Sequence, residues 1–142
     1  MFTRVVVGVD GSPASRSALR WGAEQARRHD ARLVAVMAWQ YPLVGMVPMA
    51  TGLLPPADAM DAASAEGLHQ VVLDELGTSG DLDVDEHVGL STPAELIMGQ
   101  VEPGTLVVLG RGGRSLLDGL LHRSTGQSVR ARHRCPVALV PA

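Results

Sequence analysis

The sequence contains no lysine: all 12 basic residues among its 142 are arginine. A chain without lysine has no side-chain amine for a Schiff base and no lysine nucleophile. It also lacks the lysine of a Walker-type phosphate loop and the strand lysine of protein kinases. Any anion that this chain binds must therefore be held by arginine, by backbone N–H groups or by hydroxyls.

Aromatic residues and cysteine are also scarce. Aromatic side chains make up 3% of the chain, too few to build stacking platforms for single-stranded nucleic acid. Because the net charge is also negative, at −3, we expect no nucleic-acid partner. The single cysteine, Cys135, excludes an internal disulfide and a cysteine-based zinc cluster, and we predict neither metal ligands nor catalytic residues in the chain itself.

A run without charged side chains covers residues 33–57 and has the length of a membrane span. Four prolines and two glycines within it would interrupt a helix, so we interpret it as a strand followed by an apolar loop. The amino terminus leads directly into a strand pattern and lacks the apolar core of a signal peptide. We therefore expect a cytoplasmic protein that is not associated with a membrane.

The charges are segregated along the chain. Residues 1–32, 33–110 and 111–142 carry net charges of +3, −11 and +5, and the middle segment has no basic residue at all. We expect the arginines after the fourth strand, Arg111, Arg114 and Arg123, to gather where an anion would bind. The acidic middle segment is then expected to cover other faces of the molecule.

The hydrophobic pattern predicts strands alternating with helices in a single domain, residues 1–142. Apolar, β-branched runs are typical of strands buried on both faces, whereas the more polar third strand suits a sheet edge. The pattern indicates an α/β fold, a Rossmann-like open five-stranded parallel sheet with helices on both faces and a ligand at the carboxyl ends of the strands. The expected strands cover 5–9, 33–38, 82–88, 105–109 and 136–140, and the expected helices 13–28, 57–76, 93–100 and 124–133.

Two strand ends carry residues that suit a phosphorylated ligand. Asp10 follows the first strand, and its carboxylate either complements the dipole of the next helix or accepts from a ribose hydroxyl. The fourth strand is followed by the glycine-rich stretch 110–113, whose backbone N–H groups can turn toward an anion. Ser124 and Thr125 begin the next expected helix, whose N-terminus adds further donors. A flexible loop followed by an ordinary helix cap is the alternative interpretation.

The order of these motifs resembles the universal stress protein family, whose fold is shared with adenine nucleotide alpha hydrolases. The opening V-V-V-G-V-D-G-S-P-A-S is similar to the family's first strand and turn, and Cys135 to Val140 is similar to its last strand. Gly110-x-x-Gly113 followed by Ser124-Thr125 resembles its nucleotide signature, G-x2-G-x9-G-[ST]. The resemblance extends from one end of the chain to the other.

This resemblance implies a stress-response regulator that binds an adenine nucleotide, ATP or AMP, with Mg²⁺ accompanying the nucleotide. It also implies a homodimer that pairs through Pro136 to Val140. Family roles carry over to three groups of residues. They place Val9 and Asp10 at the ribose and adenine, the backbone of Ala38 at the adenine edge, and Gly110, Gly113, Ser124 and Thr125 at the phosphates.

One position departs from the family signature, because Arg123 replaces its third glycine. The guanidinium can pair bidentately with phosphates or can block their path. Since the other signature residues are present, we favour retained binding and include Arg123 in the site. Two alternatives stay open: a dimeric interaction protein that binds no nucleotide, and a weak ATPase or self-phosphorylating enzyme, although no residue is an evident general base.

Overall fold

The computed structural model describes residues 1–41, 54–78, 80–111 and 135–142. Within them five parallel strands form one sheet in the order β3-β2-β1-β4-β5, which confirms the predicted fold class and places the third strand at an edge. The expected helix over 124–133 lies outside the described residues. In chain order the elements are β1 (Arg4–Gly8), α1 (Pro13–His29), β2 (Arg32–Trp39), α2 (Ala57–Leu76), β3 (Val84–Leu90), α3 (Pro93–Met98), β4 (Thr105–Gly110) and β5 (Val137–Val140).

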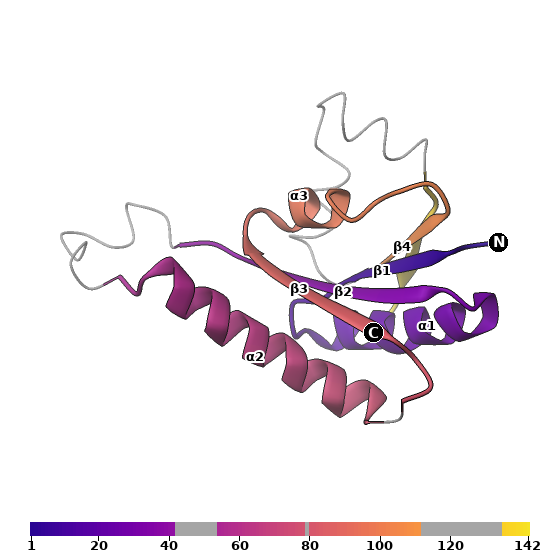
Figure 1. The fold of residues 1–142 in the computed structure, drawn as a ribbon, viewed down its shortest axis with the longest axis horizontal. Helices are drawn as coiled ribbons and strands as arrows, with labels where there is room; N and C mark the ends of the chain where they lie inside the picture. Colours follow the sequence, from indigo (N-terminus) through magenta and orange to yellow (C-terminus); the bar gives the residue numbers. More distant parts are fainter. Residues whose placement is uncertain (42–53, 79, 112–134) are drawn as a thin grey trace.

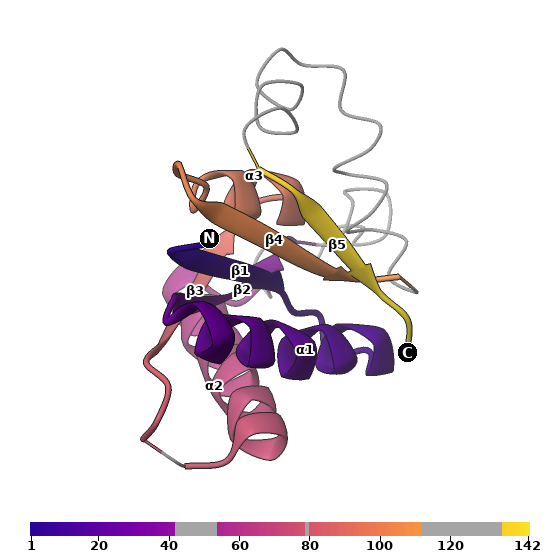
Figure 2. The same cartoon turned by 90° about the vertical axis from the view of Figure 1, so that its right-hand side faces the viewer.

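Helices cover both faces of the sheet, as expected: α1 and α2 lie on one side and α3 on the other (Figure 2). Successive side chains of a strand point to opposite faces. Val5 and Val7 of β1 therefore enter the core beneath α1 and α2, whereas Val6 enters a smaller core beneath α3. All three are fully buried, which explains why the first strand is a continuous apolar run.

The described helices begin where the sequence predicts, whereas α1 ends one residue later than expected, at His29, and α3 ends two residues earlier, at Met98. Ser12 caps α1, its hydroxyl accepting from the backbone N–H of Ser15 at 3.2 Å, and a proline occupies the first turn. Thr92 caps α3 in the same way, and Gly77 ends α2. Among the described residues no helix is both long enough and apolar enough to cross a membrane.

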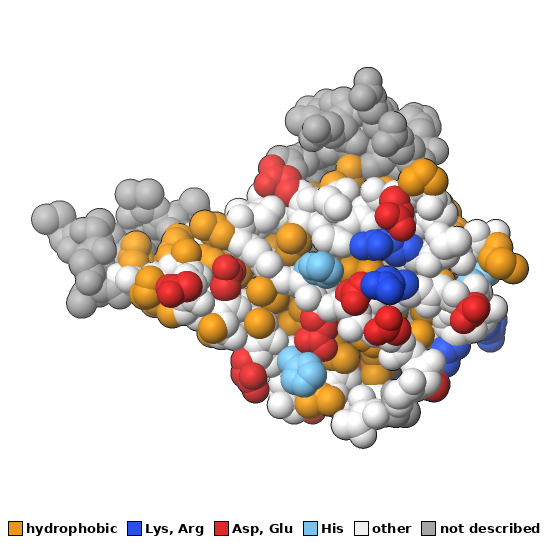
Figure 3. Space-filling model, viewed as in Figure 1, with side chains coloured by type: hydrophobic (Ala, Val, Ile, Leu, Met, Phe, Trp, Pro, Cys, Tyr) orange, Lys and Arg blue, Asp and Glu red, His pale blue; other side chains and the backbone are white. Residues whose placement is uncertain are grey.

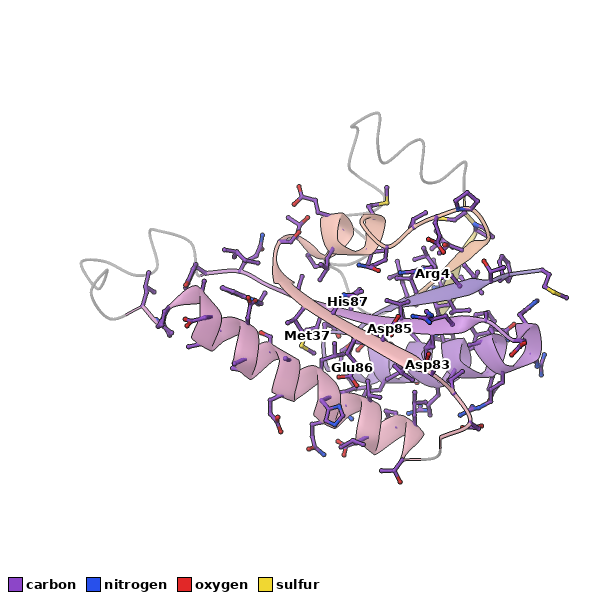
Figure 4. The ribbon with its side chains drawn as sticks, viewed as in Figure 1. Arg4, Met37, Asp83, Asp85, Glu86 and His87 are labelled. Atoms are coloured by element: carbon purple, nitrogen blue, oxygen red, sulfur yellow. The ribbon has the colours of Figure 1, made fainter. Side chains whose placement is uncertain are left out.

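The charge segregation has a structural explanation that the sequence did not suggest. Acids of the middle segment face the arginines of the first segment, so the two segments are complementary in space as well as opposite in charge. On the face drawn in Figure 3, blue and red side chains are intermixed, and Figure 4 shows Arg4 and the acids of β3 on this side of the molecule. The ion pairs are Arg4–Glu102, Arg16–Asp74, Arg16–Glu75, Arg20–Glu75, Arg27–Asp81, Arg32–Asp83 and Arg32–Asp85.

The pair between His69 of α2 and Glu86 of β3 makes a pH-dependent contact, with Nδ1 and Oε1 3.0 Å apart. Hydrogen bonding to Glu86 raises the pKa of His69 above 6.5. The pair therefore stabilises the folded state fully below the unfolded pKa, and this contribution is lost as the pH rises through the folded pKa. We expect Glu86→Gln to lower the His69 pKa in an NMR titration, and Glu24→Gln on α1 to leave it unchanged. An identical titration in Glu86→Gln would contradict the pair.

Candidate functional site

The candidate site lies at the carboxyl ends of β1 and β4. The two strands are neighbours in the sheet, with Val7 in register with Val108. The chain leaves β1 through α1 on one face and reaches β4 through α3 on the other (Figure 1). Strand order therefore reverses between β1 and β4, and ligands of open parallel sheets bind at such a switch point.

Asp10 is exposed at this edge and is held by the turn that starts α1. Its Oδ1 accepts a hydrogen bond from the backbone N–H of Ser12 at 2.9 Å. Burial acts to raise the pKa of Asp10, but hydrogen bonds from Ser12 and Ser15 outweigh it and hold the pKa below the ordinary 3.8. The carboxylate is ionised at neutral pH, and it has about four acceptor positions, so it can accept from a ligand hydroxyl while it holds Ser12.

Gly110 at the end of β4 packs directly against the first turn of α1. A Cβ at this position would lie 2.5 Å from the carbonyl carbon of Ala14 and 2.7 Å from the backbone nitrogen of Ser15. The close approach brings the end of β4 to the turn that follows Asp10. Asp10 and Gly110 therefore lie close together, as predicted for the ends of the first and fourth strands.

Ser15 also belongs to this edge, although the sequence pattern does not single it out. It is fully buried, and its hydroxyl accepts from the backbone N–H of Asp10 at 3.3 Å and donates to the carbonyl of Ser12 at 3.0 Å. A serine three residues after a serine cap was the available signal. Ser15 therefore fixes the turn that carries Asp10, and its backbone packs directly against Gly110 of β4.

The backbone of Ala38 is directed toward the same edge. The carbonyl of Val36 accepts from the backbone N–H of Val9 at 2.8 Å on the β1 side, and the carbonyl of Trp39 accepts from Ser91 at 3.2 Å on the β3 side. Because backbone groups alternate sides along a strand, those of Ala38 point toward β1, at a level beyond the last residue of β1. They can therefore meet a ligand placed between the strand ends.

The structure brings together Val9, Asp10, Ala38 and Gly110. The other predicted contacts, Gly113, Arg123, Ser124 and Thr125, lie outside the described residues, as does Arg114. Arg111 is described; it is exposed and its backbone N–H donates to the carbonyl of Val140 at 2.8 Å. In the part of the chain that the structure describes, no group of three or more His, Cys, Asp or Glu gathers to hold a metal ion.

A second arrangement missed by the sequence analysis adjoins Ala38. The indole N–H of Trp39 donates to Oδ1 of Asp61 in α2 at 2.5 Å. The Trp39 ring lies edge-on to that of Tyr41, with centroids 5.2 Å apart, and the Tyr41 hydroxyl donates to the carbonyl of Pro55 at 2.8 Å. The end of β2 is thereby joined to the start of α2.

Comparison with known proteins bears on both the fold and the family. The model of the universal stress protein family matches residues 1–141. A universal stress protein of Mycolicibacterium smegmatis is 28% identical over 139 residues, which are 96% of this chain and 47% of that protein. One of Mycobacterium tuberculosis is 32% identical over 138 residues, 94% of this chain and 43% of that protein. The chain spans about half the length of these curated relatives.

Solved structures of the same family share the fold. A universal stress family protein of Burkholderia pseudomallei aligns with a TM-score of 0.62 at 22% identity, covering 99% of this chain and 97% of that one. The universal stress protein of Archaeoglobus fulgidus in complex with dAMP aligns at 0.56 and 17% identity, covering 99% and 98%. Another, in complex with cAMP, aligns at 0.56 and 22%, covering 98% and 96%. Because the family model matches almost the whole length, the chain belongs to the universal stress protein family.

Proposed function

We propose that the chain, as a single domain, binds an adenine nucleotide, ATP or AMP, at the carboxyl ends of β1 and β4. The observation that carries this proposal is the ionised, exposed carboxylate of Asp10, held by Ser12 at the switch point of the sheet and beside Gly110. Family structures that contain cAMP and dAMP support the ligand class. We further propose that binding serves a regulator of the stress response in the cytoplasm.

Each part of the nucleotide has a proposed partner. Asp10 accepts from the ribose hydroxyls beside Val9, and the backbone of Ala38 meets the adenine edge. The phosphates lie toward α1 and the loop after β4, because arginine and backbone donors must supply the cationic side of a lysine-free site. With ATP, Mg²⁺ would be coordinated mainly by the phosphates and water, as is usual for this ion. The phosphate partners are Gly110, Gly113, Arg123, Ser124 and Thr125.

Asp10→Asn tests the proposal with little disturbance of the fold, because an asparagine oxygen can still accept from Ser12. Loss of the charge weakens the hydrogen bonds to the ribose, so we expect affinity for AMP and ATP to fall by roughly 10- to 100-fold. Isothermal titration calorimetry measures the change. Asp30→Asn is the matched control: it removes one negative charge at the other end of α1, at an exposed residue with φ of 51° that asparagine tolerates.

Absence of AMP and ATP binding by the wild-type chain at millimolar concentration would overturn the proposal. Arg123→Gly separates the two possible roles of Arg123, contact with the phosphates and closure of the site. Binding that is present in the wild type and weakened in Arg123→Gly assigns the guanidinium to the phosphates. Binding that is gained only in Arg123→Gly shows that Arg123 closes the site and that the natural chain acts as a dimeric interaction protein.

We also propose a homodimer formed through Pro136 to Val140, the segment that contains β5. β5 is an edge strand whose Val137 and Leu139 are 43% and 44% exposed, whereas the opposite edge strand, β3, carries charged residues that oppose strand pairing. We expect Leu139→Lys to convert the dimer into a monomer in light scattering after size-exclusion chromatography. Leu90→Lys, at an exposed residue of β3, should leave the dimer intact. A wild-type monomer at micromolar concentration would contradict this proposal.

A further inference from the structure

We propose that Asp61 of α2 is a positioning residue for the adenine end of the site and sets the preference for adenine over guanine. This inference rests on the proposed nucleotide binding. Asp61 is remote in sequence from every residue assigned to the nucleotide. It acts through Trp39, the last residue of β2 and the neighbour of Ala38.

The hydrogen bond between Trp39 and Asp61 is short, with Nε1 and Oδ1 2.5 Å apart. A carboxylate acceptor makes such a bond stronger than one between neutral groups. The Trp39 side chain is only 8% exposed, and an indole N–H at a buried position needs a partner. The ring is therefore held both by its burial and by the hydrogen bond at its edge.

The Trp39–Asp61 bond attaches the first half of α2 to the end of β2. Residues 57–67 include no buried residue, and the first buried side chain of the helix is Leu68. The N-cap, Pro56, makes no side-chain capping bond. The amino end of α2 projects beside the end of β2 (Figure 1), where Trp39–Asp61 and Tyr41–Pro55 hold it. The two contacts join the helix and the strand on the side next to Ala38.

A fixed strand end matters because Ala38 presents backbone groups, not a side chain, to the base. Adenine offers an amino donor where guanine offers a carbonyl acceptor. A carbonyl and an N–H distinguish the two only when their direction is fixed, since a backbone free to rotate can present either group. Pairing with β3 sets that direction as far as Trp39, whose carbonyl accepts from Ser91. Trp39 is the last residue of the strand, and Asp61 holds its side chain in place.

The test compares the dissociation constants of AMP, GMP and ribose 5-phosphate for the wild type, four single variants and one double variant. In Asp61→Ala we expect the ratio of the GMP constant to the AMP constant to fall by roughly three- to tenfold, part of the value of one charge-assisted hydrogen bond. Ribose 5-phosphate has no base and should bind equally to both proteins. Asp61→Asn keeps an acceptor oxygen and should restore the preference. Glu66→Ala removes an exposed acid of the same helix and should change nothing.

Trp39→Phe is the fourth variant and keeps a ring while it removes the indole N–H. It should reproduce the effect of Asp61→Ala, and the double variant should show no further loss if the two residues act as one unit. If Asp61→Ala does not fold, Trp39→Phe still allows the ratio of the GMP and AMP constants to be measured. An unchanged ratio, or an equal loss for all three ligands, would overturn the inference while leaving nucleotide binding intact. A wild type that does not bind AMP, or does not prefer it to GMP, would overturn this inference, and a wild type that binds neither AMP nor ATP would also refute the proposed function.

Discussion

Replacing Gly110 by valine is expected to lower the free energy of unfolding by about 3 kcal/mol or more, as severe overpacking does. A Cβ there would lie 2.5 to 2.7 Å from backbone atoms of Ala14 and Ser15. Backbone in the first turn of a capped helix cannot move aside as the end of a flexible side chain can. The strand or the helix must shift, and the turn that holds Asp10 shifts with them. Urea denaturation followed by circular dichroism measures the loss.

The matched control is Gly67→Ala, a glycine of α2 at which an added Cβ meets no atom within 4 Å. Alanine stabilises an exposed helix position by about 1 kcal/mol relative to glycine, so this variant should unfold at higher urea concentration. Opposite outcomes for the two glycines would show that contact, and not backbone flexibility, makes Gly110 necessary. A Gly110→Val protein as stable as the wild type would mean that β4 does not pass this close to α1.

The fold is predictable from the sequence because its strands are apolar on both faces. A parallel sheet covered by helices is the arrangement that buries runs such as Val5–Val9 completely. The polarity of Val84–Leu90 likewise identifies the edge strand, where fewer side chains need to be buried. Asp10 and Gly110 could be placed together for the same reason, because carboxyl ends of adjacent parallel strands share one edge.

Other features depend on pairing that no local pattern encodes. The Trp39–Asp61 bond joins residues 22 positions apart, and nothing in either segment indicates which acid of the helix faces the ring. The segregated charges predict that Arg111, Arg114 and Arg123 gather at an anion site, and of these three Arg114 and Arg123 lie outside the described residues. The partners of other arginines, such as Glu75 for Arg20 and Asp85 for Arg32, follow from the packing and not from the sequence pattern. Exposed pairs of this kind are screened by solvent and contribute little to stability, so their arrangement reflects the packing of the elements more than it causes it.

The second prediction with a large expected effect is for Ile97→Ala, in the smaller core beneath α3. Ile97 is fully buried and, apart from Ala94, is the buried residue that α3 contributes. It packs in a cluster with Val6, Val36 and Leu109 on the face of the sheet opposite α1. Removing three carbons leaves a cavity that a six-residue helix has little freedom to fill. We expect the free energy of unfolding to fall by about 2–5 kcal/mol, a large part of the 5–15 kcal/mol typical of a domain.

Ile97→Val provides the matched comparison, because it removes one methyl group and is expected to cost about 0.5–1.5 kcal/mol. The ratio between the two losses, measured by urea denaturation, reports how rigidly α3 is held. If Ile97→Ala costs no more than Ile97→Val, the helix moves inward to close the cavity, and the α3 layer is pliable. If the full loss is observed, α3 is a fixed support beneath β1 and β4. The strand ends that carry Asp10 and Gly110 then rest on a rigid core, as a site that aligns backbone groups with a ligand requires.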